Sequence, residues 1–205
     1  MAAQTRTRHQ EILPPGLLFS PDFLTPTEEN ELLTFLSALE FRTFQMQGVT
    51  AKRRIRQFGW HYAFESYQLM PTDPIPEEFA SIRARSADLV DIDPAAWAEA
   101  LVTEYTPGAG IGWHRDAPAF GVVAGISLAG SCRMRFQTGA GPARVTSAID
   151  LPPRSIYALT GEVRTRWQHM IPPTRERRYS ITFRTLREQR TRPSAARGIE
   201  ARRLR

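Results

Sequence analysis

The chain has 205 residues, of which 41% are hydrophobic, and its formal net charge is +6 at pH 7. This length favours a single domain with a sizeable core, which excludes a disordered chain and a peptide that needs disulfides to fold. No apolar run approaches the ~20 residues of a membrane span, and the N-terminal residues contain no apolar signal-peptide core. Cys132 is the only Cys, so no intrachain disulfide can form. We therefore expect a cytoplasmic, monomeric protein with no membrane partner.

Every basic residue except Lys52 is Arg, and several of them lie in residues 188–205. That segment has little to bury, so we expect a basic, disordered tail there and a flexible arm over residues 1–15. A basic balance suits an anionic partner such as nucleic acid, although an Arg-rich surface can also serve solubility alone. A single domain over residues 16–187 remains between the two ends.

Two helices are expected in the first part of this domain. Residues 24–40 have a capping box formed by Thr25 and Glu28, followed by leucines that recur on one helical face. Residues 75–90 form a second amphipathic pattern opened by Pro76.

Strands are expected elsewhere. Residues 41–64 alternate aromatic and polar side chains, which predicts strands with a turn near Gly48. Residues 99–187 contain many short strand-like runs separated by Gly and Pro, a pattern typical of a β-sandwich or barrel. The last runs before the C-terminus are residues 164–171 and 177–186. The sequence therefore predicts an α+β fold in which residues 16–98 extend a β core over residues 99–187.

Within that core, the stretch GIGWHRDAPAFG places His114 two residues before Asp116. Residues i and i+2 of a strand face the same side, so both side chains can reach one metal ion. His169, on a later strand, completes the set of two imidazoles and one carboxylate that holds iron in non-haem Fe(II) oxygenases. A structural zinc site would usually take four ligands with Cys among them. The remaining alternative is a chance His and Asp that bind no metal.

Two Arg follow on another strand. Arg178 and Arg184 are six residues apart in RYSITFR, an even spacing that puts both on one face of the strand. Guanidinium groups bind carboxylates in a bidentate manner and keep their charge. Two inward Arg near a metal suit a dicarboxylate, whereas the alternative is that they pair with surface acids.

The segments TEYTPGAGIGWHRD, WQHMIPP and RYSITFR together resemble the AlkB family of Fe(II)- and 2-oxoglutarate-dependent dioxygenases. The resemblance extends over residues 14–187 and is strongest over residues 101–187. It implies a double-stranded β-helix (jelly roll) core, preceded by helices and a substrate-recognition hairpin. The cofactor that it implies is Fe(II), with 2-oxoglutarate and O₂ as cosubstrates.

The resemblance also implies roles for single residues. Iron would be held by the three catalytic residues His114, Asp116 and His169. Arg178 would bind the distal carboxylate of 2-oxoglutarate, Arg184 would lie near the carboxylate that chelates iron, and Tyr105 would donate its hydroxyl. Where the family often has Asn, this chain has Thr103 and Ser180, and both can still form hydrogen bonds with the cosubstrate.

The substrate side departs from the family pattern. DNA-repair members carry an acidic residue shortly after the ligand Asp, where it contacts the flipped base, but Ala117 and Pro118 stand here. The recognition hairpin corresponds to residues 42–65, which combine basic and aromatic residues as backbone binding and base stacking require. The expected substrate-binding residues are Lys52, Arg53, Arg54, Arg56, Phe58, Trp60 and Tyr62. Alternatively, the aromatics form one buried strand face and the basic run is a solvated strand.

The sequence thus predicts a dioxygenase that removes methyl or other alkyl groups from nucleobases of DNA or RNA, with single strands preferred to duplexes. Hydroxylation of an N-methyl group would release formaldehyde, and 2-oxoglutarate would give succinate and CO₂. Two alternatives stay open. One is the same oxidation of a protein side chain or small molecule, which Pro118 slightly favours. The other is a jelly roll that binds metal or ligand without turnover, against which the complete ligand set and both Arg argue.

Overall fold

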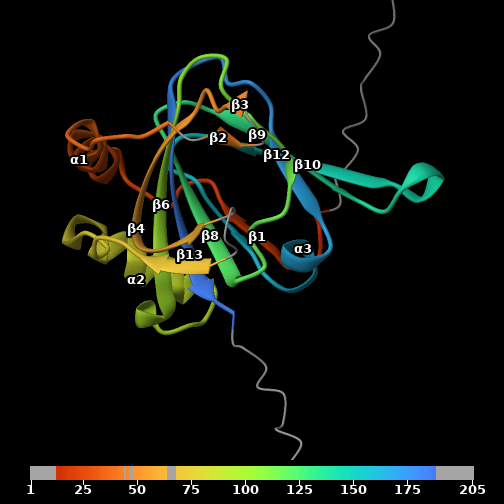
Figure 1. The fold of residues 1–205 in the computed structure, drawn as a ribbon, viewed down its shortest axis with the longest axis horizontal. Coiled ribbons are helices and arrows are strands. Elements are labelled where there is room, and N and C mark those ends of the chain that lie inside the picture. Colours follow the sequence, from red (N-terminus) through yellow and green to blue (C-terminus); the bar gives the residue numbers. More distant parts are fainter. Residues whose placement is uncertain (1–12, 44, 47–48, 64–67, 188–205) are drawn as a thin grey trace, which may run out of the picture.

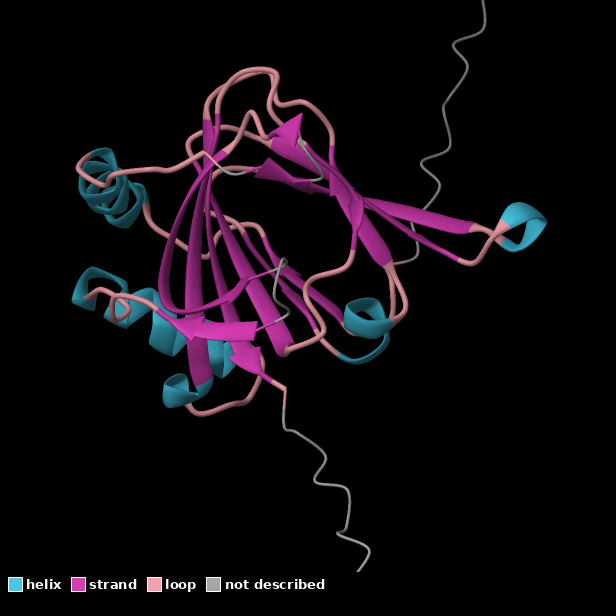
Figure 2. Cartoon of the chain, in the orientation of Figure 1, coloured by secondary structure: helices cyan, strands magenta, loops and turns pink. Residues whose placement is uncertain are grey.

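Two antiparallel β-sheets form the centre of the computed structural model, which describes residues 13–43, 45–46, 49–63 and 68–187 (Figures 1 and 2). The major sheet has seven strands in the order β1-β11-β8-β13-β6-β4-β5, and the minor sheet has four in the order β10-β9-β12-β7. From β6 to β13 the chain crosses repeatedly between the two sheets, which is the topology of a double-stranded β-helix. The predicted jelly-roll fold is therefore confirmed.

The strands have the following bounds. The major sheet contains β1 (Leu17–Ser20), β4 (Arg54–Ala63), β5 (Gln68–Pro71), β6 (Trp97–Tyr105), β8 (Phe120–Leu128), β11 (Ile156–Leu159) and β13 (Arg178–Leu186). The minor sheet contains β7 (Ile111–His114), β9 (Cys132–Thr138), β10 (Val145–Leu151) and β12 (Gln168–Ile171). A separate ribbon pairs β2 (Gln45–Met46) with β3 (Val49–Thr50).

Helices α1 (Pro26–Ser37) and α2 (Ala80–Leu89) cover the outer face of the major sheet (Figure 1). The other helical elements are α3 (Gly161–Thr165) and the 3-10 turns η1 (Glu77–Phe79), η2 (Pro94–Ala96) and η3 (Gly141–Ala143). The predicted capping box is present, because Thr25 accepts from the Glu28 backbone N–H and Glu28 accepts from that of Thr25. None of the helices in the described ranges is long and apolar enough to span a membrane.

The core has two parts, one on each side of the major sheet. Leu36 of α1 and Ile82 of α2 pack with Phe79, Trp97 and Phe183 on the outer side, and all five are buried. Between the two sheets lies a second cluster that includes Val123, Met134, Phe136, Leu151 and Leu159. The space between the sheets is therefore filled by apolar side chains except where polar residues line the site described below.

Several boundaries differ from those expected. Strands β1, β4 and β5 all precede residue 99, so the major sheet draws on the segment that was expected to be an extension. Residues 164–165 end a short helix, so the strand expected over residues 164–171 is wrong at its start. The expected turn at Gly48, most of the expected N-terminal arm and the basic tail lie outside the described residues.

Gly59 divides β4 into two halves. Residues before it pair with β6, and residues after it pair with β5. Its φ is +78°, and a Cβ at this position would lie 2.1 Å from the carbonyl oxygen of Ala98, so only Gly fits. The turn of the backbone breaks the strand alternation, which leaves Phe58 5% exposed and Trp60 38% exposed.

Candidate active site

Strand pairing in the minor sheet brings two His side chains together. His114 ends β7 and His169 lies in β12, and the two are direct partners in the antiparallel pairing. Their ring centroids are 4.2 Å apart. The Nδ1 atom of His114 lies 2.9 Å from the carbonyl oxygen of Gly112. When Nδ1 donates that bond, Nε2 keeps the lone pair that a metal ion needs.

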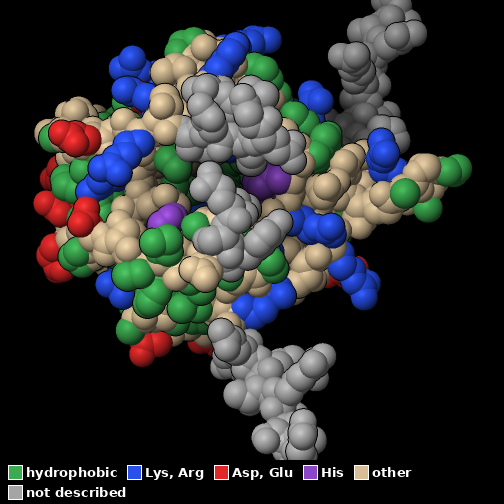
Figure 3. Space-filling view, in the orientation of Figure 1, with side chains coloured by type: hydrophobic (Ala, Val, Ile, Leu, Met, Phe, Trp, Pro, Cys, Tyr) green, Lys and Arg blue, Asp and Glu red, His purple; other side chains and the backbone are tan. Residues whose placement is uncertain are grey.

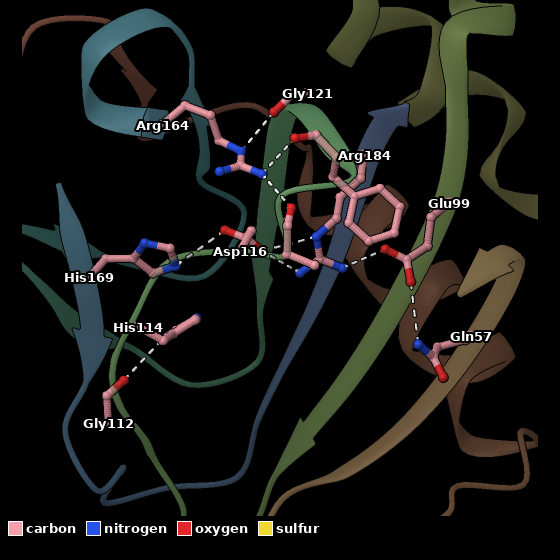
Figure 4. A network of polar contacts seen from close by, with 11 residues as sticks. Gln57, Glu99, Gly112, His114, Asp116, Gly121, Arg164, His169 and Arg184 are labelled. Atoms are coloured by element: carbon pink, nitrogen blue, oxygen red, sulfur yellow. Dashed lines mark hydrogen bonds and ion pairs between the residues drawn. The ribbon is translucent and has the colours of Figure 1, made fainter. Parts of the chain in front are cut away.

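Asp116 reaches the two His from a turn rather than from a strand. The expectation that His114 and Asp116 share a strand is wrong, because β7 ends at His114. The Oδ2 atom of Asp116 lies 3.5 Å from Nε2 of His169. Its Oδ1 accepts two hydrogen bonds from Arg184, at 2.7 and 3.0 Å. The carboxylate is thus held with one oxygen toward His169 and the other toward Arg184 (Figure 4).

Arg164 fixes the turn that carries Asp116. Its side chain comes from α3 and donates to the carbonyl oxygens of Ala117, Phe120 and Gly121 at 2.7–2.9 Å (Figure 4). The residue is 6% exposed, so these bonds form away from water. Hydrogen bonds from a charged donor contribute about 1.5–3 kcal/mol each. Arg164 was not predicted to have a role, and it sets the place of Asp116 through the backbone that follows it.

Burial controls the protonation of this cluster. It lowers the pKa of His169 to about 3 and also lowers the pKa of His114. Both imidazoles are therefore neutral at neutral pH, which is the form that binds metal. Burial disfavours the ionised form of Asp116, but Arg184 and the other neighbouring groups together outweigh it and hold the pKa of Asp116 below its usual range. The cluster offers two neutral nitrogen donors and one anionic oxygen.

These donors suit a divalent metal ion, although their present positions do not close around one. Within the described ranges, no three His, Cys, Asp or Glu side chains are already spaced as metal ligands. The Oδ2 atom of Asp116 is nevertheless buried with no hydrogen-bond partner among these residues. Leaving such an atom unsatisfied costs about 1–3 kcal/mol, which a bound cation would remove.

Arg178 forms the second polar centre. It is completely buried, its Nε donates to Ser127 Oγ at 3.0 Å, and its guanidinium lies 5.0 Å from the centroid of the Tyr105 ring. Its Nη1 and Nη2 atoms are buried with no hydrogen-bond partner in the described part of the chain. The Cys132 thiol is a neighbour, but burial raises its pKa, and a protonated thiol is a weak acceptor. Two buried guanidinium nitrogens without a partner are suited to a carboxylate.

The other residues expected to bind the cosubstrate line the same face. Strands β13 and β6 pair so that Arg178 is opposite Tyr105 and Ser180 is opposite Thr103. Directly opposed residues of antiparallel strands share a face. Thr103 and Ser180 are both buried. Ser127, opposite Ser180 on β8, adds a hydroxyl that was not predicted.

Arg184 lies further along β13 and forms ion pairs with two carboxylates of the protein. Besides its bonds to Asp116, its Nη1 lies 2.7 Å from Oε2 of Glu99, which is 1% exposed. Burial raises the pKa of Glu99, and Arg184 opposes that shift. Gln57 donates to the other Glu99 oxygen at 3.3 Å. Neither Glu99 nor Gln57 was predicted. Because every second residue of a strand faces the same side, the alternation from Tyr105 back to Glu99 places Glu99 on the inner face and could have identified it.

The basic residues expected to bind substrate have protein partners. Arg54 donates to the buried Glu104 at 2.6 Å, and Arg56 binds Asp73. Arg53 donates to a main-chain carbonyl in the turn before β7, at 3.3 Å. The expected continuous row of phosphate-binding side chains is therefore interrupted by ion pairs that the sequence did not reveal.

The aromatic residues of β4 differ in their exposure to solvent. Phe58 packs on Phe79, with ring centroids 6.2 Å apart, so it belongs to the core and the prediction that it contacts substrate is wrong. Trp60 is exposed and Tyr62 is partly buried. Lys52 is exposed just before β4. The break at Gly59 separates the buried aromatic from the accessible ones.

Comparison with known proteins places this site in context. Residues 16–190 match the model of the 2OG-Fe(II) oxygenase superfamily. The tRNA (carboxymethyluridine(34)-5-O)-methyltransferase ALKBH8 of Mus musculus is 31% identical over 180 residues, which cover 83% of this chain and 26% of the mouse protein. The alkylated DNA repair protein ALKBH8 homolog of Arabidopsis thaliana is 30% identical over 188 residues, which cover 77% of this chain and 51% of that protein. The chain thus spans about a quarter and about a half of these two relatives.

The fold has a counterpart among solved structures. The structure of OsALKBH1 matches with a TM-score of 0.67 at 16% identity, over 85% of this chain and 99% of the other. At this identity the likeness concerns the fold and not the substrate.

Proposed function

Because the chain belongs to the 2OG-Fe(II) oxygenase superfamily and is AlkB-like, we propose that it oxidatively removes alkyl groups from nucleobases in single-stranded DNA or RNA. Enzymes of this superfamily use Fe(II), 2-oxoglutarate and O₂. The main support for the proposal is that the guanidinium of Arg178 is fully buried with two nitrogens that lack a hydrogen-bond partner among the described residues. Arg178 lies on the sheet face that also presents Arg184, which holds Asp116.

We assign the iron ligands to the cluster of His114, Asp116 and His169. The two imidazoles are neutral, and the carboxylate keeps its charge beside Arg184. When bound, Fe(II) supplies the activation of O₂. The protein supplies the orientation of Asp116, through Arg184 on one side and the turn held by Arg164 on the other.

We assign 2-oxoglutarate to the polar inner face of β6 and β13. Arg178 would pair with its distal carboxylate through Nη1 and Nη2, and Tyr105 would donate its hydroxyl. Thr103, Ser180 and Ser127 provide further hydroxyls on this face. The burial of Arg178 strengthens such a pair, because a low local dielectric increases the attraction between opposite charges.

The proposed reaction balances in atoms and electrons. Decarboxylation of 2-oxoglutarate to succinate and CO₂ delivers two electrons to O₂, and the C–H bond of the N-methyl group delivers the other two. One oxygen atom enters succinate and the other becomes the hydroxyl of an N-hydroxymethyl group. That group then loses formaldehyde, and the nitrogen of the base regains its hydrogen.

Charge distribution and relatives support a nucleic-acid substrate. The curated relatives carry tRNA and alkylated DNA in their names. In Figure 3, Lys and Arg side chains surround the face on which His is visible, and acidic side chains gather at the edge over the helices. Trp60 is 38% exposed on β4 and can offer a surface for base stacking.

A panel of methylated oligonucleotides tests the proposal. The purified protein, with Fe(II), 2-oxoglutarate and O₂, should form succinate and formaldehyde in equal amounts on at least one methylated DNA or RNA strand. Mass spectrometry should report the loss of one CH₂ from that strand. The Asp116→Ala variant is the matched control and should give neither product. If succinate forms but no oligonucleotide loses mass, and a peptide or small molecule gains one oxygen atom instead, the alternative substrate class is correct.

A further inference from the structure

A pocket beside Asp116 is lined in part by polar and charged residues to which the proposed reaction gives no role. It has a volume of about 410 Å³ and lies between the turn after β7, helix α3 and the end of β13. Its lining residues are Arg115, Asp116, Pro118, Arg164, Thr165, Gln168 and Arg187. Three guanidinium groups and one carboxylate thus face a single space.

The pocket presents hydrogen-bond donors. Arg164 uses Nε and Nη2 for the turn carbonyls, and Figure 4 shows its Nη1 pointing away from that turn. Gln168 accepts a bond from Gln137 through its Oε1, which leaves its N–H groups as donors. Arg115 and Arg187 are exposed at the rim. Side chains that can only donate are suited to an anion.

The charges in the pocket are not balanced from within. Asp116 is the one acidic lining residue, and Arg184 already pairs with it. Burial lowers the pKa of Arg164, the nearby carboxylate of Asp116 opposes that shift, and repulsion from Arg187 and Arg184 adds to it. An anion in the pocket would relieve this repulsion.

The pocket is separate from the proposed cosubstrate site. Arg178 begins β13, and Arg187 follows the last residue of that strand. At about 3.3 Å per residue, roughly 30 Å of strand separates the two positions. The distal carboxylate of 2-oxoglutarate at Arg178 therefore cannot be the anion in question.

We propose that this pocket binds a phosphodiester of the substrate strand next to the nucleotide that is oxidised. Arg binds phosphate oxygens in a bidentate manner, and contacts to phosphate position a strand without reading its sequence. A base that enters an active site leaves its stack, so the adjoining backbone must be held. Asp116 forms part of the pocket wall, so a phosphate held here lies next to the proposed iron ligands. This inference rests on the proposed function.

The test combines protein variants with a neutralised phosphate. Binding of a methylated single-stranded oligonucleotide is measured by fluorescence anisotropy over a salt series, with Mn(II) in place of Fe(II) to prevent turnover. The variants are Arg115→Gln, Arg187→Gln and the double variant. Arg83→Gln on α2, on the opposite side of the major sheet, is a control with the same change of charge as each single variant. Melting curves check that each variant folds.

The double variant should flatten the slope of log K against log salt by about 0.7, the value for one phosphate of a single strand. Replacing the phosphate that flanks the methylated base by a methylphosphonate should weaken wild-type binding and should not weaken the double variant further. Arg83→Gln should bind like wild type.

Four outcomes overturn the inference. If the methylphosphonate weakens strand binding to the wild type and to the double variant equally, the phosphate is held elsewhere. If Arg83→Gln loses as much affinity as Arg115→Gln or Arg187→Gln alone, only overall charge matters. If inorganic phosphate binds wild type but not the double variant, while strand binding is unchanged, the pocket serves a free anion. If the wild type binds no oligonucleotide, the proposed function fails together with this inference, whereas the other three outcomes leave that function standing.

Discussion

Replacing Arg178 by Met should stabilise the protein in the absence of cosubstrate and remove its response to 2-oxoglutarate. Met has an unbranched side chain that fills part of the same buried space but carries no charge. The wild-type side chain is fully buried with Nη1 and Nη2 unpaired among the described residues, so the protein without cosubstrate bears the cost of a desolvated charge. The variant removes that cost and also removes the partner that the cosubstrate needs.

The size of the effect follows from these contacts. An unsatisfied buried polar group costs about 1–3 kcal/mol, and loss of the bond to Ser127 offsets part of the gain. A net gain of about 1–2 kcal/mol corresponds to about 2–8 °C in Tm for a domain of this size. Stranding the cosubstrate carboxylate without its charged partner should cost about 2–5 kcal/mol of binding, or roughly 30- to 5,000-fold in affinity.

Thermal melting with and without 2-oxoglutarate measures both effects, and the KM for 2-oxoglutarate from succinate formation provides a second reading. Arg178→Lys should recover only part of the affinity, because Lys cannot form the bidentate pair. Arg184→Met is the matched control on the same face of β13. The Arg184→Met variant leaves two buried carboxylates, those of Asp116 and Glu99, without their charged partner. Its Tm should therefore fall, with a loss of about 3–5 kcal/mol in the free energy of unfolding.

The two Arg variants should therefore shift Tm in opposite directions. If Arg178→Met melts below wild type without cosubstrate, as Arg184→Met should, then Arg178 has a partner in the empty protein. An unchanged KM for 2-oxoglutarate would place the dicarboxylate site elsewhere. Either result would refute the reasoning from the unpaired nitrogens.

Three further predictions concern the rest of the site. Succinate formation should be lost, with the fold retained, in the single Ala variants of His114, Asp116 and His169. Circular dichroism checks the fold, and near wild-type turnover in Asp116→Ala would exclude it as a ligand. Arg164→Met should lower Tm by at least about 9 °C, because three charge-assisted bonds are lost, and should weaken Mn(II) binding in a titration. Unchanged Mn(II) affinity would show that the turn holds Asp116 without it. Trp60→Ala should weaken oligonucleotide binding by about 1–3 kcal/mol at constant Tm, whereas Phe58→Ala should cost about 3–5 kcal/mol of stability. Equal stability losses in these two variants would contradict the division of β4.

Local patterns predicted those features that depend on near neighbours in sequence. The capping box at Thr25 involves residues three apart, and it formed as expected. Arg178 and Ser180 lie on one regular strand, so their spacing was enough to place both on the inner face. Glu99 could have been found by the same alternation, because β6 is regular from Tyr105 back to that residue.

The missed features depend on backbone irregularities or distant partners. Asp116 lies beyond the end of β7, so strand alternation did not explain its position, and the turn is held by Arg164 from a helix 47 residues further along the chain. Gly59 interrupts the alternation of β4, so Phe58 and Trp60 have different environments although they are two residues apart. Arg54 was expected to face phosphate because its partner, Glu104, lies 50 residues away in sequence.

The positive φ at Gly59 also has an evolutionary consequence. The residues before it are constrained by pairing with β6 and by packing on the helices, whereas the residues after it pair only with β5, at the edge of the major sheet. A substitution at Trp60 or Tyr62 can therefore alter the surface of the segment after Gly59 without disturbing the packing of Phe58. Under the proposed function, selection can alter substrate range in this short segment while the oxidation machinery stays intact, provided that Gly59 itself is kept.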